Sequence, residues 1–171
     1  AVAARPTLSP AGQDVRTSTA ESFDHWRHLV AESFVPLTAS SADADHFSGR
    51  MRARRLDRVA LVEVSSTSHE VHRTSALIAQ SNQRYFKLNL QLQGTGLLVQ
   101  DNREAVLHPG DLSIYDTSRP YTLAFEGDAR LMVVMFPWDA LSLPPDCIAQ
   151  LSAVRMASDG GLAAIVGPFI A

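Results

Sequence analysis

The feature that most constrains this chain is a succession of short apolar runs between residues 88 and 137. Apolar and polar residues alternate within the runs, and a period of two is typical of a β-strand with one buried face. The runs therefore indicate the scaffold of the fold. The apolar positions are Leu88, Leu90 and Leu92; Leu97 to Val99; Val106 and Leu107; Leu112 and Ile114; Leu123 and Phe125; and Leu131 and Val133.

Turn-forming residues separate these runs at intervals of roughly ten residues. The separators are Gly94-Thr95-Gly96, Asp101-Asn102, Pro109-Gly110-Asp111, Ser118-Arg119-Pro120 and Gly127-Asp128. Close turns between alternating strands favour an antiparallel sandwich or barrel over a parallel sheet. We therefore expect a mainly β fold. Short helical segments are expected at three further places: residues 75–80, 138–141 and 146–154.

Composition limits the class of protein. The chain has 171 residues, 46% of them apolar and 19% charged, which predicts one folded domain. A net charge of −3 without a basic run is poorly suited to holding nucleic acid by electrostatics alone. Cys147 is the only cysteine, so no intrachain disulfide can form. No signal peptide or membrane-spanning run is evident, and we expect a cytoplasmic location.

The N-terminal region predicts a tail followed by a helix. Residues 1–16 are rich in Ala and Pro without periodicity, and we expect a disordered tail. Ser18 and Glu21 form a capping-box pattern that predicts a helix over residues 19–35. Its apolar positions are Phe23, Trp26, Leu29, Val30 and Phe34. An amphipathic helix packed on the barrel is the simplest interpretation, and a role for Trp26 in a ligand pocket is the alternative.

Residues 47–66 are expected to form two strands, with Met51 and Ala53 on one face of the first strand. Five arginines lie within nine residues: Arg50, Arg52, Arg54, Arg55 and Arg58. A solvated outer face explains them most simply. Alternatively, one of them contacts another domain or pairs with an anionic ligand group, since a guanidinium matches a carboxylate bidentately. Arg50 and Arg52 are the candidates for the ligand role.

The spacing of several short motifs resembles the N-terminal sensor domain of the AraC/XylS family of bacterial transcription regulators. The motifs are Gly94-x-Gly96, Pro109-Gly110-Asp111, Tyr115-Asp116, Arg119-Pro120-Tyr121 and Met135-Phe136-Pro137. Pro-Gly-Asp alone indicates only a cupin, a fold with many functions. The later motifs narrow the resemblance to the regulators, and it covers about residues 47–141.

The resemblance implies a cupin-like β-barrel, or jelly roll, that binds a small effector and forms a homodimer, with flanking N- and C-terminal helices. Members of the family bind DNA through a C-terminal helix-turn-helix domain, which we do not find in this sequence. We therefore expect a fragment of a longer regulator, with the sensor domain at residues 17–157. Residues 158–171 are expected to open the helix that links the domains and pairs two protomers.

The resemblance also implies which side chains line the pocket. If the strand orientation of the family's sugar-binding members holds, Leu123 and Phe125 face inward from one strand, and Arg130, Met132 and Val134 from the last strand. The candidate polar lining residues are Asn89, Gln91 and Tyr115. Such a pocket suits a small aromatic or aliphatic acid, amide or amine better than a sugar. Effector binding is expected to order residues 46–55 or the N-terminal helix and to shift the dimerising helices.

Catalytic cupins hold a metal through His and Glu residues on facing strands, and this pattern is missing here. With Gly94 as the reference glycine, Lys87 stands at the glutamate position and Tyr121 stands near the second-motif histidine. His69 and His72 fall on opposite faces of a strand, which does not suit one ion. We expect no metal, no cofactor and no enzymatic activity. Two alternatives remain: a cupin enzyme with a non-standard metal site, and a dimerisation module that binds no ligand.

Overall fold

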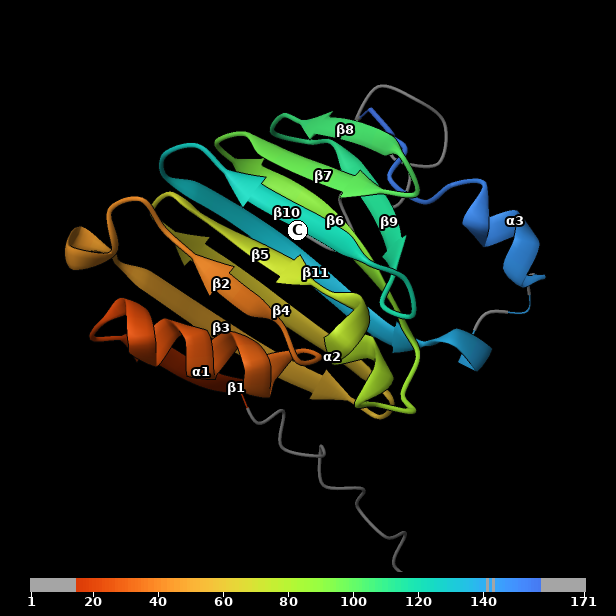
Figure 1. The fold of residues 1–171 in the computed structure, drawn as a ribbon, viewed down its shortest axis with the longest axis horizontal. Helices are drawn as coiled ribbons and strands as arrows, with labels where there is room; N and C mark the ends of the chain where they lie inside the picture. The colour runs from red at the N-terminus through yellow and green to blue at the C-terminus, as the bar shows by residue number, and fades with distance from the viewer. Residues whose placement is uncertain (1–14, 141, 143, 158–171) are drawn as a thin grey trace, which may run out of the picture.

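The computed structural model describes residues 15–140, 142 and 144–157. These residues form two antiparallel β-sheets that face each other (Figure 1). The six-stranded sheet has the order β1 (Val15–Ala20), β3 (Gly49–Leu56), β4 (Val59–Ser66), β11 (Ala129–Pro137), β6 (Tyr85–Gln93) and β9 (Leu112–Asp116). The five-stranded sheet has the order β2 (Thr38–Ser40), β5 (His69–Arg73), β10 (Tyr121–Phe125), β7 (Gly96–Gln100) and β8 (Arg103–Leu107). The predicted mainly β fold is confirmed.

Tight turns join the strands at the predicted positions. Asp101 and Asn102 form a two-residue loop between β7 and β8 and have φ angles of 54° and 59°. Positive φ at both positions is the conformation of a type I′ hairpin turn. In the next loop, a carboxylate oxygen of Asp111 accepts a hydrogen bond from the backbone N–H of His108 at 2.8 Å. Gly110, with φ of 93°, supplies the left-handed conformation of that turn.

Helix α1 (Phe23–Ser33) lies between the edge strands β1 and β2 and closes one side of the barrel (Figure 1). Its apolar residues recur at helical spacing, so one face packs against the sheets. The buried residues of this face are Phe23, Trp26, Leu29 and Val30. The Arg27 side chain fixes the helix to β2 by donating a hydrogen bond to the Ala39 carbonyl at 3.1 Å. The predicted packing of an amphipathic helix on the barrel is confirmed.

The start of this helix corrects the sequence prediction. Ser18 lies in β1, opposite Met51 of β3, and Ser22 caps the helix by accepting a hydrogen bond from the His25 N–H at 3.1 Å. Pairing along β3 therefore prevails over the local capping-box pattern of Ser18. Residues 15 and 16, predicted to be part of the tail, also belong to β1, whereas residues 1–14 lie outside the described residues.

The C-terminal part of the described chain returns along the barrel. The short helical segments are α2 (Ser75–Ala79), a 3₁₀ turn at Trp138–Ala140 and α3 (Pro145–Ala149), and another 3₁₀ turn lies at Ala44–His46. The helix predicted for residues 146–154 is thus too long. Beyond α3 the chain makes a turn in which Ala153 has a φ of 53°, and Ser152 and Met156 form isolated β-bridges with β9. The predicted linking helix at residues 158–171 lies outside the described residues. Within the described part, no helix has the length and apolar character needed to cross a membrane.

Candidate functional site in the barrel interior

A small cavity of about 40 Å³ lies inside the barrel. A cavity of that size holds only a few water molecules. Side chains from both sheets and from α1 line it, and most of them are aromatic or aliphatic. The lining residues are Trp26, Val30, Phe34, Leu37, Met51, Val64, His69, Val71, Lys87, Tyr115, Tyr121, Leu123, Phe125, Leu131 and Val133. A mostly apolar wall with a few polar groups is the usual composition of a small-molecule site.

Lys87 of β6 is the only lysine in the chain, and it points into this cavity. Only 2% of the residue is exposed. Its Nζ donates a hydrogen bond to the Tyr121 hydroxyl at 3.0 Å and lies 4.4 Å from the ring centre of Phe34. Burial, with a smaller contribution from the charge of Arg73, lowers the pKa of Lys87 to about 7.

Arg73 of β5 is a second buried cation close to Lys87. Its Nε donates to the Thr117 carbonyl at 3.0 Å and its Nη1 to the Pro36 carbonyl at 2.8 Å, while Nη2 has no hydrogen-bond partner in the described structure. Among the described residues, no carboxylate forms an ion pair with either Arg73 or Lys87. The barrel interior therefore carries positive charge without a protein counter-ion, an arrangement that is costly unless something else compensates it.

Two further polar groups follow Lys87 along the inner face of β6. Asn89 accepts a hydrogen bond from the Tyr115 hydroxyl at 3.2 Å, but its Nδ2 has no partner in the described structure. Gln91 donates to the Gln93 carbonyl at 2.9 Å, and its Oε1 is unpaired there. Asn89 and Gln91 are both fully buried. Buried amide groups usually satisfy their hydrogen bonds, so these two unused atoms form an unsatisfied polar strip on the inner face of β6.

The opposite end of the cavity is aromatic and held in one arrangement. Trp26 donates its indole N–H to Nε2 of His69 at 3.1 Å, and Nδ1 of His69 lies 3.1 Å from the Thr67 carbonyl. Burial lowers the pKa of His69. A neutral His69 with its proton on Nδ1 satisfies both contacts. The rings of Phe47 and Phe125 lie 5.4 Å from that of His69, so packed rings form this end of the cavity.

The structure places the predicted pocket residues in two groups. Tyr115, Leu123 and Phe125 line the cavity, and Asn89 and Gln91 lie on the inner face of β6 beside it. Their role in binding a ligand stays a prediction. Sequence reasoning missed Lys87, Tyr121 and His69 as lining residues. The sequence feature that could have identified them is the alternation of side chains along a strand. Each of these polar residues occupies a position whose neighbours in the strand face outward.

The predicted inward orientation of Arg130, Met132 and Val134 is wrong. Leu131 and Val133 of β11 line the cavity instead, and alternation along the strand turns their neighbours to the outer face. On that face Arg130 donates a hydrogen bond to Glu63 at 2.7 Å, which satisfies a charge that the interior would leave unpaired.

Arg50 and Arg52 also lie outside the cavity. Both are exposed on the outer face of β3. In the sheet, Arg50 and Arg130 both pair with Ser65 of β4, and Arg52 and Met132 both pair with Glu63. Arg50 and Arg130 line a groove at the end of these strands. The predicted contact of Arg50 or Arg52 with a ligand in the barrel therefore has no support from their positions.

Replacing Arg130 with alanine is now expected to leave ligand affinity in the barrel unchanged, contrary to the expectation from the sequence. Its ion pair with Glu63 is partly solvated, so we expect a loss of stability below about 1 kcal/mol. Calorimetric titration of the variant with a ligand that binds the native chain checks this. A severalfold loss of affinity would return Arg130 to the site.

The sequence resemblance puts Lys87 at one metal-ligand position of catalytic cupins and Tyr121 near the second, and these two side chains contact each other in this barrel. An ammonium group and a phenol do not form the carboxylate and imidazole set that binds divalent metals. Within the described ranges, no group of three or more His, Cys, Asp or Glu side chains is close enough to hold a metal ion.

Replacing Lys87 with methionine should stabilise the native state by about 1–3 kcal/mol at pH 7, because it removes a buried charge without a counter-ion. The folded pKa is about 7 and the unfolded value is about 10.5, so the unfolded chain binds more protons between these pH values. The stability of the native chain should therefore rise as the pH increases through this window, whereas the variant lacks this rise. Urea unfolding at pH 7 and pH 9 measures both effects. A variant less stable than the native chain at pH 7 would contradict this account of Lys87.

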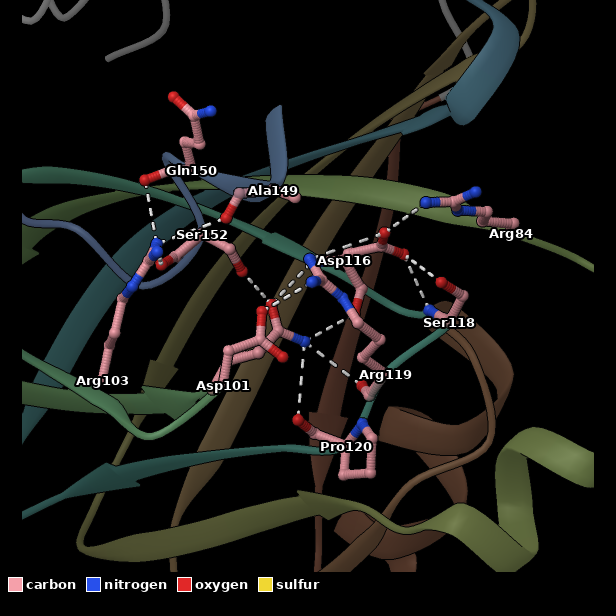
Figure 2. A network of polar contacts seen from close by, with 11 residues as sticks. Arg84, Asp101, Arg103, Asp116, Ser118, Arg119, Pro120, Ala149, Gln150 and Ser152 are labelled. Atoms are coloured by element: carbon pink, nitrogen blue, oxygen red, sulfur yellow. Dashed lines mark hydrogen bonds and ion pairs between the residues drawn. The ribbon is translucent and has the colours of Figure 1, made fainter. Parts of the chain in front are cut away.

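A polar network connects the rim of the barrel near Tyr121 to the C-terminal segment (Figure 2). The Gln100 side chain donates to the carbonyls of Asp116 and Arg119 at 2.7 and 3.2 Å, and its Oε1 accepts hydrogen bonds from the Asp116 N–H and the Ser152 hydroxyl. Arg103 donates to three carbonyls of the C-terminal segment, including that of Gln150 at 2.8 Å. The segment after α3 is thus fixed to the turn that precedes Tyr121.

Asp116 is the anchor of this network. Its carboxylate accepts hydrogen bonds from Arg84 at 2.7 Å and from the N–H and hydroxyl of Ser118 at 2.8 and 2.7 Å. Burial alone would raise the pKa of Asp116, but the hydrogen bonds from Arg84 and Ser118 outweigh it and hold the pKa below its usual range. Arg119 pairs with Asp101 at 2.6 Å. Asp116 and Arg119 therefore form and hold this turn.

The two facing sheets, with the cavity between them, define a mainly β, cupin-like barrel. The sequence of residues 26–171 matches the AraC-binding-like domain family. The chain therefore belongs to this family, and the resemblance seen in its motifs is confirmed.

The chain is also similar to individual proteins. Over 117 residues the chain is 39% identical to a protein of Bacillus sp. (strain OxB-1) described as an uncharacterized protein in the nit 5′ region, and the match covers 68% of this chain and 45% of the relative. The crystal structure of the AraC-like transcriptional activator CuxR has a TM-score of 0.78 at 18% identity, covering 92% of this chain and 59% of CuxR. A cupin superfamily protein of Desulfitobacterium hafniense DCB-2 overlaps 57% of this chain and 84% of its own, with a TM-score of 0.41 and 17% identity. The chain thus spans about half the length of the first two relatives.

Proposed function

We propose that this chain is the effector-binding domain of a bacterial AraC/XylS-type transcription regulator. The observation that carries the proposal is the cavity inside the barrel, which Lys87 lines with an ammonium group that has one hydrogen-bond partner among the described residues. Arg73 and Asn89 lie outside this lining, and each keeps a buried nitrogen atom that no described protein group satisfies. Membership of the AraC-binding-like family supports a regulatory role. The effector is a small aromatic or aliphatic acid, amide or amine that replaces solvent in this cavity.

The cavity has to widen for any effector larger than a few atoms. Phe34 and Leu37 belong to the segment between α1 and β2, and both are only partly buried. Displacing these two side chains enlarges the cavity without disturbing either sheet. The effector therefore acts on the position of α1, which supplies Trp26 and Val30 to the same wall.

A signal also has a route toward the C-terminal segment. Tyr121 contacts Lys87, and the residues before Tyr121 are held by Gln100, which in turn binds Ser152. An effector that moves Tyr121 changes the contacts of this turn and hence the position of the chain that follows. Such differential contact is what couples two sites thermodynamically. In the proposed regulator, this segment continues into the helix that forms the homodimer and connects to a DNA-binding domain. The regulator acts in the cytoplasm.

A thermal-shift panel of small acids, amides, amines and sugars tests the proposal. A compound that binds only the native state raises the melting temperature as its concentration increases. We expect at least one acid, amide or amine to raise the melting temperature in a saturable manner and the sugars to have no effect. A panel without any shift would contradict the proposal.

The small size of the cavity favours a second candidate, a dimerisation module whose barrel is filled by its own side chains. This candidate predicts no response to any compound, together with a dimer whose stability does not depend on added ligand. Sedimentation equilibrium with and without the panel compounds separates the two functions. A ligand-dependent change in the monomer–dimer equilibrium supports the effector-binding domain.

A further inference from the structure

We propose that the site in the barrel recognises a carboxylate, so that the effector is a small organic acid rather than an amide or amine, with the Lys87 ammonium and the Tyr121 hydroxyl as its direct ligands. This inference rests on the proposed function and narrows the chemical class of its effector. It follows from the kind of polar atoms that the cavity leaves unused.

The unused polar groups near Lys87 are donors. The Lys87 ammonium has three N–H groups, and the described structure gives it one partner, the Tyr121 oxygen. Because that oxygen accepts the bond from Lys87, the Tyr121 hydroxyl proton is free to be donated to a ligand. The amide nitrogen of Asn89 and Nη2 of Arg73 add further unpaired N–H groups. Lys87 and Tyr121 both line the cavity, so their free N–H and O–H groups require an acceptor there, and a carboxylate supplies two oxygen atoms.

The charges around Lys87 select among the three possible effector classes. The other titratable groups that line the cavity are Tyr115 of β9 and Tyr121 of β10 near Lys87 and His69 of β5 at the far end. Arg73 of β5 does not line the cavity, but its charge acts on Lys87. None of them carries a negative charge at neutral pH. A carboxylate neutralises the Lys87 charge, whereas an amide satisfies hydrogen bonds only. A protonated amine would add a third cation to Lys87 and Arg73 in a site without a counter-ion.

The remaining wall sets the shape of the acid. Leu123, Leu131 and Val133 surround the cavity, and the rings of Phe125 and His69 close its far end. Among the buried side chains of the described residues, the one unpaired acceptor is Oε1 of Gln91, and it lies next to Gly96. An acid with one carboxylate and an apolar body therefore fits this arrangement, and a sugar or a dicarboxylate does not.

Carboxylate binding should be linked to the protonation of Lys87. Without ligand, burial sets its pKa to about 7, and an adjacent carboxylate favours the charged form. Binding therefore takes up protons above pH 7, and the affinity for an acid should fall with rising pH, by up to about tenfold per pH unit, until the pH reaches the raised pKa of Lys87 in the complex. Affinity for a neutral amide should not follow this dependence.

The test uses matched probes on the 171-residue chain: propionate, propionamide and propylamine, and benzoate, benzamide and benzylamine. Titration calorimetry at pH 7 should show that each acid binds at least about tenfold more tightly than its amide, and that neither amine binds. Lys87→Met should lose this preference for acids. Arg58→Gln is the matched control, because it removes one positive charge from the half-exposed surface pair with Asp139 and should leave the preference unchanged.

The outcomes separate this inference from the function on which it rests. Equal or tighter binding of an amide or amine would overturn the carboxylate inference and leave the effector-binding function intact. Absence of binding by all six probes would overturn the inference, and the wider thermal-shift panel would then decide the function. If Lys87→Met does not fold, the pH dependence of acid binding to the native chain decides the role of Lys87. An affinity that stays constant from pH 7 to pH 10 would exclude Lys87 as the ligand.

Discussion

Replacing Trp26 with alanine should lower the free energy of unfolding by about 3–5 kcal/mol, as expected for truncation of a large buried aromatic side chain. Trp26 has no exposed surface, and its ring packs 5.3 Å from that of Phe47. The change also leaves Nε2 of His69 without its hydrogen-bond donor in the core. Trp26 is also a residue through which α1 packs on the barrel. Since a typical domain is stable by only about 5–15 kcal/mol, a loss of that size removes a large part of its stability. Urea unfolding followed by circular dichroism measures it.

The second tryptophan provides the matched control. Trp138 is 46% exposed and makes a cation–π contact with Arg84 on the surface. Its replacement with alanine should cost less than about 1 kcal/mol. Equal losses for the two alanine variants would contradict the central packing role that we assign to Trp26.

Replacing Asp116 with alanine should destabilise the protein by about 2–4 kcal/mol, because several donors lose a buried acceptor at once. The Asp116 side chain is 2% exposed, and it accepts hydrogen bonds from Arg84 and from two groups of Ser118. Arg84 is partly solvated, which keeps the loss below that of a fully buried ion pair. The turn before Tyr121 should loosen together with the C-terminal segment, so hydrogen exchange at residues 150–156 should become faster.

The stability lost on replacing Asp116 should depend on pH. The folded pKa of Asp116 lies below its usual value, so the unfolded state binds more protons in that acidic range. The stabilisation by Asp116 is therefore complete above about pH 4 and is lost as the pH falls through the folded pKa. The difference between native chain and variant should shrink in acid. Asp139→Ala, which breaks the solvated pair with Arg58, is the control and should cost less than about 1 kcal/mol at any pH. A difference for Asp116→Ala that grows in acid would contradict the assignment.

Much of the fold could be predicted because its signals are local. Alternation in the strands after Leu88 and the Asp101-Asn102 turn each reflect the geometry of a few neighbouring residues. The start of α1 could not be predicted, because Ser18 and Ser22 are both good capping residues. The choice between them depends on the pairing of β1 with β3, whose paired residues range from Ala20 with Gly49 to Val15 with Arg54 and are therefore far apart in the chain.

The site could be predicted only in part, for a similar reason. Leu123 and Phe125 alternate clearly, and the structure places both in the cavity. On β11 the residues of both parities are largely apolar, so periodicity does not distinguish Leu131 from Met132, and the predicted face is the wrong one. In the sequence, Lys87 stands out only as a residue that replaces a metal ligand. Its role as a lining residue becomes evident from two facts taken together: it is the only lysine among the 15 Lys and Arg residues of the chain, and it is buried on the inner side of β6.

The most direct test of this account is the titration of Lys87 itself. Because it is the only lysine, a sample labelled with ¹³C-lysine gives a single side-chain signal in NMR spectra. Without ligand, the Cε shift should titrate with a midpoint near pH 7, as burial without a counter-ion requires. Saturating propionate should move this midpoint upward by more than one pH unit. A midpoint near the ordinary lysine value of about 10.4, unchanged by any acid, would contradict the buried cationic site on which the proposed recognition depends.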